Sequence, residues 1–146
     1  MQKISIRTSR RCDIVDITPF VRTCLREIGA ESGVMTLFCP HTTAGLTVNE
    51  NADPDVRRDL TAFLNRAIPQ EAGYAHSEGN SDAHIKSTLT NSAQMLIVEG
   101  GEVMLGTWQG VFFMEYDGPR SREVWLQFTG SHRQSGSETS RPKERP

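Results

Sequence analysis

The alternation of apolar and polar residues near the start of the chain predicts two short strands. "KISIRT" alternates Ile4 and Ile6 with polar neighbours, as a strand does when one of its faces is buried. "CDIVDIT" follows as a second short strand. Further along, "GVMTLFC" from Gly33 is an apolar run bounded by Gly and Pro, and "GLTVN" comes after it. Both runs are expected to form buried strands.

Two segments carry apolar residues at helical spacing together with helix start and stop signals. In "TPFVRTCLREIGA", Thr18 is expected to be the N-cap, Pro19 the first helical residue and Gly29 the stop. Its buried face is expected to consist of Val21, Cys24, Leu25 and Ile28. In "DPDVRRDLTAFLNRAI", Asp53 is expected to cap a second helix that begins at Pro54. The buried stripe of that helix is expected to be Val56, Leu60, Phe63 and Leu64.

The second half of the chain is predicted to be mostly strand. Residues 69–80 are irregular, and Ser81 is placed to cap a short helix that runs through Leu89. Strands are then expected in "AQMLIVE", "EVMLGTWQGVFFMEY" and "REVWLQFTG", with Asp117-Gly118-Pro119 joining the last two as a hairpin. These elements together predict a single-domain α+β fold with a β-sandwich core, about six to eight strands and two or three helices.

The chain is expected to divide into a domain at 1–130 and a polar tail at 131–146. The tail contains no aliphatic residue and is expected to be disordered or loosely attached. A chain of 146 residues is most simply one domain and can bury a core without disulfides. Cys12, Cys24 and Cys39 form no CxxC pair and are expected to be reduced, mostly buried thiols.

Composition and charge exclude several classes of partner. With 23% charged residues, a formal charge of −2 and a pI near 6.1, the chain carries no general nucleic-acid-binding surface. Its apolar runs are too short to cross a bilayer, and the N-terminus lacks the apolar segment of a signal peptide. We therefore expect a cytoplasmic protein with no nucleic-acid partner and no membrane partner.

The first polar stretch of interest is "PHTTAGLTVNENADPDVRRD". His41 follows a buried strand, Thr42 adds a hydroxyl beside it, and Glu50 lies between the next strand and the second helix. Loops after strands are where a rigid scaffold presents reactive groups. The alternative is structural, with His41 holding a turn through hydrogen bonds.

The second polar stretch, "HSEGNSDAH", contains little that a hydrophobic core could use. His76 and His84 are candidate ligands for a divalent metal, and His41 is the natural third ligand. The carboxylate alternatives are Glu78, Glu50 and Asp82. Without a metal, the same histidines would serve as general acid and base near neutral pH. The structural alternative is a polar loop that bonds its own backbone and begins a helix.

The third stretch, "LGTWQGVFFMEYDGPRSREV", ends an apolar strand with acidic residues and a tight turn. Strand periodicity places Gln109, Val111, Phe113 and Glu115 on one face. Arg120 follows Gly118 and Pro119 and is suited to hold phosphate or carboxylate with two hydrogen bonds. Alternatively, Arg120 pairs with Glu115 or Asp117 and braces the hairpin.

Three phrases of the chain, taken together, resemble the signature blocks of the YjbQ-like family, which is often labelled secondary thiamine-phosphate synthase. They are "HTTAGLTVNENADPDV" at 41–56, "HSEGNSDAHIKSTL" at 76–89 and "GTWQGVFFMEYDGPRSREV" at 106–124. They occur in family order and spacing, and the similarity spans about residues 3–130. The resemblance implies an α+β fold built on a β-sandwich, a homotrimer and a polar pocket near a subunit boundary. In some members a metal ion is thought to lie there.

The family's site positions carry over to this chain residue by residue. We assign catalytic roles to His41, Glu50, Glu78, Asp82 and Arg120. Substrate-binding roles are assigned to Thr42, Asn49, Asn80, Trp108, Gln109, Glu115 and Asp117, and metal binding to His41, His76 and His84. The metal would be zinc, nickel, manganese or magnesium. The chain has no Gly-rich phosphate cradle and no DDxxD-like pair, so its main substrate is expected to differ from those of thiamine-phosphate synthesis.

Three hypotheses about function follow. The leading one is an enzyme with a histidine and carboxylate site that acts on a small phosphorylated or anionic metabolite. The alternative is a non-catalytic module that binds a small anion. The third, a trimeric structural protein, is disfavoured because interface cores are normally depleted of charged residues.

Overall fold

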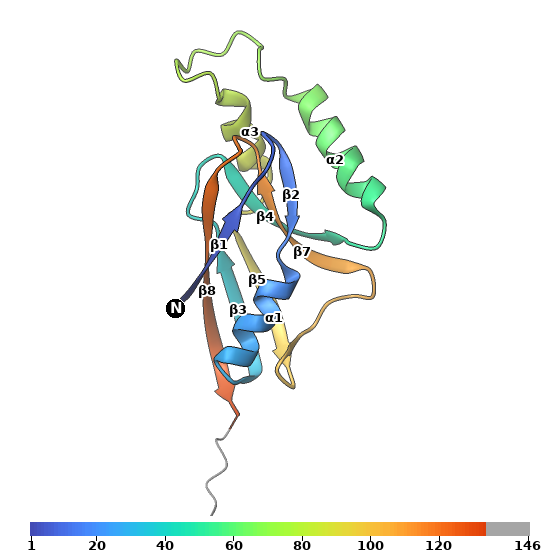
Figure 1. The fold of residues 1–146 in the computed structure, drawn as a ribbon, viewed down its shortest axis with the longest axis vertical. Helices are drawn as coiled ribbons and strands as arrows, with labels where there is room; N and C mark the ends of the chain where they lie inside the picture. The colour runs from blue at the N-terminus through green and yellow to red at the C-terminus, as the bar shows by residue number, and fades with distance from the viewer. Residues whose placement is uncertain (134–146) are drawn as a thin grey trace, which may run out of the picture.

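The computed structural model describes residues 1–133, which form eight strands and three helices (Figure 1). In chain order the elements are β1 (Gln2–Arg7), β2 (Asp13–Asp16), α1 (Thr18–Glu27), β3 (Ala30–Phe38), β4 (Ala44–Glu50), α2 (Pro54–Ala67), α3 (Ser81–Leu89), β5 (Ala93–Glu99), β6 (Glu102–Val103), β7 (Gln109–Glu115) and β8 (Ser121–His132). β8 continues past position 130, where the tail was expected to begin, because Ser131 and His132 pair with β3. The rest of the expected tail, residues 134–146, lies outside the described residues.

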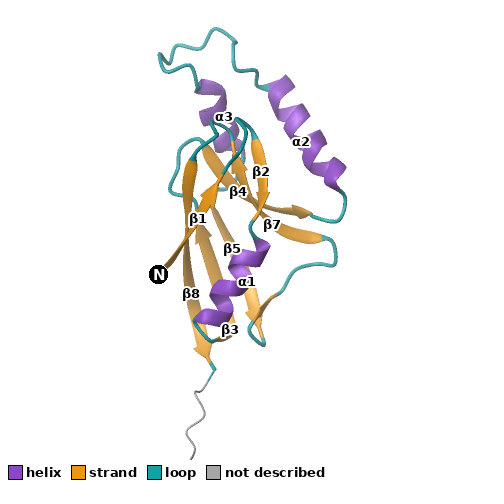
Figure 2. Ribbon diagram, in the orientation of Figure 1, coloured by secondary structure: helices purple, strands orange, loops and turns teal. Residues whose placement is uncertain are grey.

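The strands form two antiparallel sheets that pack against each other (Figure 2). The larger sheet has the order β1-β8-β3-β5-β6 and the smaller one β2-β7-β4. The apolar faces of the two sheets and of α1 enclose the main core. Its fully buried members include Ile17, Val21, Leu25, Met35, Leu37, Leu46, Val98, Val111, Phe113 and Val124. The predicted α+β fold with a two-sheet core is confirmed.

β7 is covered on both faces, which explains its nearly continuous apolar sequence. Val111 and Phe113 point into the main core, whereas Phe112 and Met114 belong to a second cluster with Ala83 of α3. Both side-chain sets of the strand therefore lie out of water, and Glu115 at its end is buried as well.

α1 forms where the sequence predicts it, but its first residue differs from the prediction. Ile17 occupies the N-cap position, and Thr18 is the first helical residue. The Asp16 carboxylate accepts the N–H of Thr18 at 2.9 Å. The Thr18 hydroxyl accepts the N–H of Val111 in β7 at 2.8 Å. The threonine thus ties α1 to the smaller sheet and does not cap the helix.

α2 has the predicted cap but not the predicted buried face. The Asp53 carboxylate accepts the N–H of Asp55 at 2.9 Å, and Pro54 begins the helix. No residue of α2 is fully buried, and Phe63 is 57% exposed. The reason is its position, because α2 lies beside β2 at one edge of the molecule (Figure 1).

The predicted hairpin between the last two strands is wrong. β7 pairs with β2 and β4 in the smaller sheet, whereas β8 pairs with β1 and β3 in the larger one. Both edges of each strand are therefore already occupied, and the turn through Gly118 and a cis Pro119 passes from one sheet to the other. The predicted strand "EVMLGTWQGVFFMEY" is likewise two strands, β6 and β7, joined by a loop.

α3 begins one residue earlier than its predicted cap, Ser81, implies. Asn80 occupies the N-cap position, and Ser81 is the first helical residue. None of the helices in residues 1–133 is both long enough and apolar enough to cross a membrane.

Candidate functional site

A buried ion pair closes the end of the main core between the two sheets. Arg122 of β8 donates from Nη2 and Nε to the two carboxylate oxygens of Glu115, at 2.5 and 2.8 Å. The Thr8 hydroxyl and the N–H groups of Tyr116 and Asp117 complete the carboxylate's hydrogen bonds, at 3.0 to 3.1 Å. Burial raises the pKa of Glu115, but these hydrogen bonds outweigh it and hold that pKa below its ordinary value. Glu115 is therefore a charged structural anchor, saturated with donors.

His41 lies beside this ion pair and serves the turn that follows β3. Its Nε2 lies 2.9 Å from the backbone nitrogen of Glu123 and 3.2 Å from the Glu123 carbonyl oxygen. In the shorter contact Nε2 accepts the N–H of Glu123, and the ring is then neutral with its proton on Nδ1. Burial and the positive charge of Arg122 lower the pKa of His41. Arg122 also donates to the Thr43 hydroxyl at 2.8 Å.

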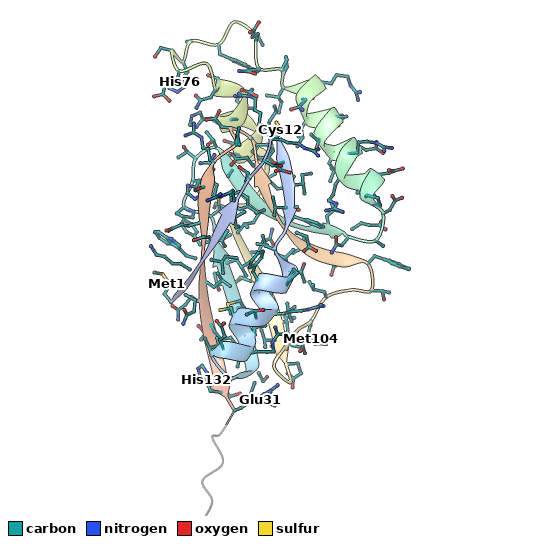
Figure 3. All side chains as sticks on the ribbon, viewed as in Figure 1. Met1, Cys12, Glu31, His76, Met104 and His132 are labelled. Atoms are coloured by element: carbon teal, nitrogen blue, oxygen red, sulfur yellow. The ribbon has the colours of Figure 1, made fainter. Side chains whose placement is uncertain are left out.

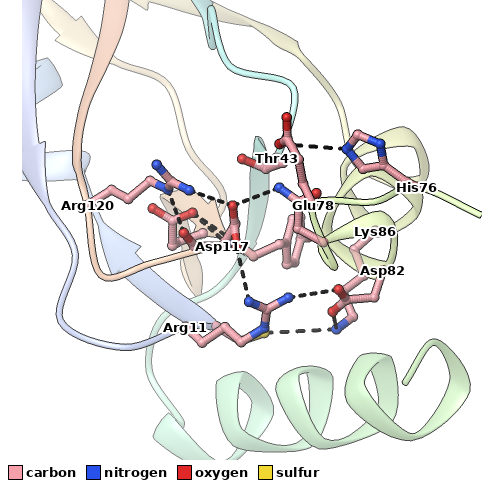
Figure 4. Close-up of polar contacts among 12 residues, drawn as sticks. Arg11, Thr43, His76, Glu78, Asp82, Lys86, Asp117 and Arg120 are labelled. Carbon is pink, nitrogen blue, oxygen red and sulfur yellow. Dashed lines mark hydrogen bonds and ion pairs between the residues drawn. The ribbon is translucent and has the colours of Figure 1, made fainter. Parts of the chain in front are cut away.

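Asp117 is the centre of a second, half-exposed group of charges. Figure 4 shows its carboxylate between Arg11 and Arg120, which donate at 3.1 and 2.8 Å. Asn80 donates to the same carboxylate at 3.0 Å, and Nε of Arg120 donates to the Asp117 carbonyl at 2.7 Å. Burial raises the pKa of Asp117, but the bonds from Asn80 and Arg120 and the positive charges lower it overall.

Arg11 connects this group to a fully buried pair inside α3. It donates to Asp82 at 2.8 Å, and Lys86 donates to the other oxygen of Asp82 at 2.9 Å. Lys86 and Asp82 are each 1% exposed, and Lys86 also donates to Asn65 of α2 at 2.9 Å. Asp82 is therefore bound to two cations and serves to hold α3 in place.

The two histidines and Glu78 of the "HSEGNSDAH" stretch lie toward the outside of the molecule. The rings of His76 and His84 meet edge to face with centroids 5.5 Å apart, and a Glu78 oxygen lies 3.7 Å from Nε2 of His76. They border an open hollow of about 500 Å³, whose lining residues are Tyr74, Ala75, His76, Ser81, His84 and Ile85. Figure 3 places His76 in the loop at one end of the molecule's long axis.

The predicted metal site does not form within residues 1–133 of a single chain. No group of three His, Cys, Asp or Glu side chains in this part of the chain is arranged to hold a metal ion. His41 is bonded to the backbone of β8 and does not join His76 and His84. The residues present in one chain therefore do not fit a closed set of metal ligands.

Four of the predicted site residues, one catalytic and three substrate-binding, lie at the opposite end of the smaller sheet. The pairing of β4 with β7 sets Ala44 against Glu115 at one end and Glu50 against Gln109 at the other. Six strand residues separate the two ends, which corresponds to about 20 Å. Asn49 and Trp108 lie at the same far end as Glu50, and Trp108 is 65% exposed. These four residues are therefore not brought to Asp117 in one chain, and Thr42 makes no side-chain hydrogen bond among residues 1–133.

Sequence reasoning found Asn80, Asp82, Glu115, Asp117 and Arg120, which the fold does bring to one end of the molecule. It assigned no site role to the residues that hold them, which are Thr8, Arg11, Thr43, Lys86 and Arg122. Lys86 had a local signal, because it lies four residues after Asp82 on a predicted helix and so on the same face.

Two antiparallel sheets around one core, with charged groups gathered where β7 turns into β8, define a small α+β protein of the two-sheet class. Residues 2–131 match the family model described as "UPF0047 protein YjbQ-like". The chain belongs to this family, and the resemblance found in the three sequence phrases is confirmed.

Relatives and solved structures agree with this assignment. MJ1081 of Methanocaldococcus jannaschii is 48% identical over 128 residues, which cover 88% of this chain and 93% of that protein. YugU of Bacillus subtilis is 44% identical over 131 residues, covering 89% and 99%. A crystal structure from Clostridium acetobutylicum has a TM-score of 0.86 at 47% identity and covers 88% of this chain and 100% of that one. One from Thermus thermophilus has a TM-score of 0.83 at 42% identity, with the same coverage.

The descriptions of these relatives state membership of the family or a conserved hypothetical protein, and they name no activity. They give no support to the label of thiamine-phosphate synthase. This chain is thus a member of a family of uncharacterised proteins, and its activity has to be argued from its own residues.

Proposed function

We propose that the chain binds a small phosphorylated or otherwise anionic metabolite beside the β7–β8 turn, and that Arg120 holds the anionic group. The supporting observation is how Arg120 is bonded. Its Nε and Nη2 donate to Asp117, while Nη1 has no partner among residues 1–133. The side chain is 53% exposed, so the guanidinium is fixed on one side and open on the other. A guanidinium oriented in this way suits phosphate or carboxylate.

The histidine pair supplies the acid and base of the proposed enzyme. His76 and His84 face each other across 5.5 Å, and Glu78 is near enough to His76 to orient it. Asn80, two residues after Glu78, is bonded to the carboxylate that also binds Arg120. The loop is thus tied to the anion-binding arginine, as a base that acts on a bound metabolite requires.

The alternative is a binding module that performs no reaction. It is favoured by the saturation of the buried carboxylates, because Glu115, Asp82 and Asp117 are all occupied by cationic donors. Among the predicted catalytic carboxylates near the turn, this leaves Glu78 as the free base, and its side chain is 71% exposed.

The first experiment measures binding of pyrophosphate by calorimetry to wild type, Arg120→Gln and Arg22→Gln. Arg22 is exposed in α1 and controls for the loss of one positive charge. We expect Arg120→Gln to weaken binding about tenfold or more, since it removes a charge-assisted hydrogen bond. Equal affinity in all three proteins would remove Arg120 from the site.

Turnover is tested separately, by incubating the protein with pooled phosphorylated metabolites and following their loss by mass spectrometry. Formation of thiamine phosphate from its two precursors is one arm of this assay. If the protein is an enzyme, we expect wild type to form a product that the His76→Ala/His84→Ala protein does not form. If binding depends on Arg120 but every metabolite is recovered unchanged, the result favours the binding module that performs no reaction.

A divalent metal enters this proposal only with ligands from outside the single chain. His76 and His84 would provide two ligands, and a second copy would have to provide the rest. Plasma mass spectrometry of untagged protein beside the double histidine variant tests this point. About one zinc, nickel, manganese or magnesium ion per wild-type chain, lost in the variant, is the expected result for a metal site.

We also propose that copies of the chain assemble as a homotrimer through the outer face of the larger sheet. The middle of this face carries Val34 and Phe38 from β3 and Met95 and Ile97 from β5, with no charge between them. Met95 is 77% exposed and Ile97 66% exposed. An uncharged, apolar face of this kind has the composition of an interface between subunits.

A further inference from the structure

A second hollow lies between β2 and α2 and includes none of the residues proposed above to hold the metabolite. Its volume is about 670 Å³, within the range typical of small-molecule sites. The residues that line it are Arg10, Cys12, Asp13, Ile14, Pro54, Asp55, Arg57, Arg58, Thr61 and Ala62. Three arginines and two aspartates give the lining an excess of one positive charge.

Arg57 is the most informative of these residues. It is half-buried on α2, and its guanidinium carbon lies 5.5 Å from the centre of the Phe112 ring. No hydrogen bond or ion pair joins its side chain to another residue between 1 and 133. Its charge is therefore oriented by an aromatic ring while its N–H donors stay free.

Arg10 brings a second free guanidinium from the opposite wall. It precedes β2, is exposed, and has no side-chain partner within the described part of the chain. The acidic residues of the hollow do not pair with Arg10 or Arg57. Asp13 accepts from the N–H and hydroxyl of Ser9 at 2.8 and 2.9 Å, and Asp55 pairs with Arg58 at 3.0 Å.

We propose that this hollow is a second anion site, and that Arg57 and Arg10 bind the phosphate of a small phosphorylated ligand from its two walls. Ile14, Pro54 and Ala62 provide apolar surface for the rest of the ligand. The proposal does not depend on Arg120, so either site stands if the other fails.

The test is a calorimetric titration of Arg120→Gln protein with pyrophosphate, in which the site at the turn is disabled. Into this background we introduce Arg57→Gln, Arg10→Gln or the control Arg22→Gln. We expect Arg57→Gln to weaken binding about tenfold or more and Arg10→Gln about threefold or more, with Arg22→Gln within about twofold. Because Arg10 is exposed, we expect Arg10→Gln to leave the fold intact. The Arg10 variant therefore tests the site even if Arg57→Gln disturbs α2.

Three outcomes of this pyrophosphate titration would overturn the proposal. One is no binding by the background protein at pyrophosphate concentrations up to about 5 mM. Another is unchanged affinity in both the Arg57 and the Arg10 variants. The third is an equal loss in the Arg22 control, which would point to net charge alone. A parallel titration with succinate decides the ligand class, since equal affinity for this dicarboxylate would contradict a phosphate site.

Discussion

Arg122 donates two hydrogen bonds to Glu115 where little water reaches, since Glu115 is 0% exposed and Arg122 8%. An ion pair of this kind loses hydration on both partners, and its geometry has to compensate. Here the carboxylate receives further donors from Thr8 and the turn backbone. Removing one partner leaves the other charged and unpaired, which makes the pair sensitive to single substitutions.

We therefore expect Glu115→Gln to lower the free energy of unfolding by about 3–5 kcal/mol, because it leaves the Arg122 guanidinium buried without a counter-charge. Urea denaturation followed by circular dichroism measures the change. Asp59→Asn, an exposed change on α2, is the control and should have no effect beyond error. A loss no larger than that of the control would mean that water reaches the pair.

His41 makes stability depend on pH near neutrality. Its folded pKa is lowered by burial and by Arg122, below an ordinary value of 6.5. As the pH falls, the unfolded chain takes up this proton first, so the contribution of His41 to stability is full above about pH 6.5 and is lost toward the lowered pKa. We expect the unfolding free energy of wild type to fall between about pH 7 and pH 5 more steeply than that of His41→Gln.

The measurement is urea denaturation at half-unit steps of pH. Glutamine keeps an acceptor for the Glu123 N–H but does not titrate, and His84→Gln controls for the loss of a histidine elsewhere. Parallel slopes for wild type and His41→Gln would contradict a lowered pKa for His41.

Some single contacts of the site were predictable from sequence and others were not. Arg120 pairs with Asp117, one of the two alternatives that local spacing allowed. The bonds from Arg11 to Asp82 and Asp117 were not predictable, because they join parts of the chain that become neighbours only after both sheets form. Likewise, His41 was assigned to a metal, although its ring is occupied by the backbone of β8.

At the scale of elements, the β7–β8 turn depends on how closely the backbone passes Arg10. The N–H of Gly118 donates to the Arg11 carbonyl at 2.9 Å. A Cβ at Gly118 would lie 2.3 Å from the Arg10 carbonyl oxygen, which is far too close. Glycine is therefore required here by close approach, and the turn carries Asp117 and Arg120 with it.

We expect Gly118→Ala to destabilise the protein by about 1–3 kcal/mol, since the added methyl forces the backbone apart. It should also weaken binding of pyrophosphate at Arg120, because the turn moves. Thermal unfolding and calorimetry measure the two effects. The matched control is Gly106→Ala, whose Cβ would meet only the Gln109 side chain, at 3.2 Å. If the two variants unfold at the same temperature, the turn is less constrained than its contacts imply.

Helices were easier to predict than strand partners. Asp53 and Pro54 mark the start of α2 by local chemistry alone. The partners of β7 and β8 depend on which strands remain unpaired, and short turns favour a hairpin that the complete sheets exclude. The exposure of Phe63 has the same origin, since helical periodicity shows which face is apolar but not whether anything covers it.

At the scale of the whole molecule, the outer face of the larger sheet determines how copies associate. We expect wild type to sediment as a trimer and Ile97→Lys to sediment as a monomer, because a charge at the centre of an apolar interface is costly to bury. Analytical ultracentrifugation distinguishes the two. Glu102→Lys, exposed on the edge strand β6, is the control. A trimer that persists in Ile97→Lys would place the interface elsewhere.

The pairing of the first strand with the last has a consequence for how the protein is made. β8 lies between β1 and β3 and provides the partner for both. A ribosome releases β1 and β3 long before Ser121 is synthesised, so the nascent chain carries two open strand edges until translation is nearly finished. Folding of the larger sheet is therefore a late event. A product that stops before Ser121 would expose those edges permanently, which makes it a substrate for chaperones and proteases.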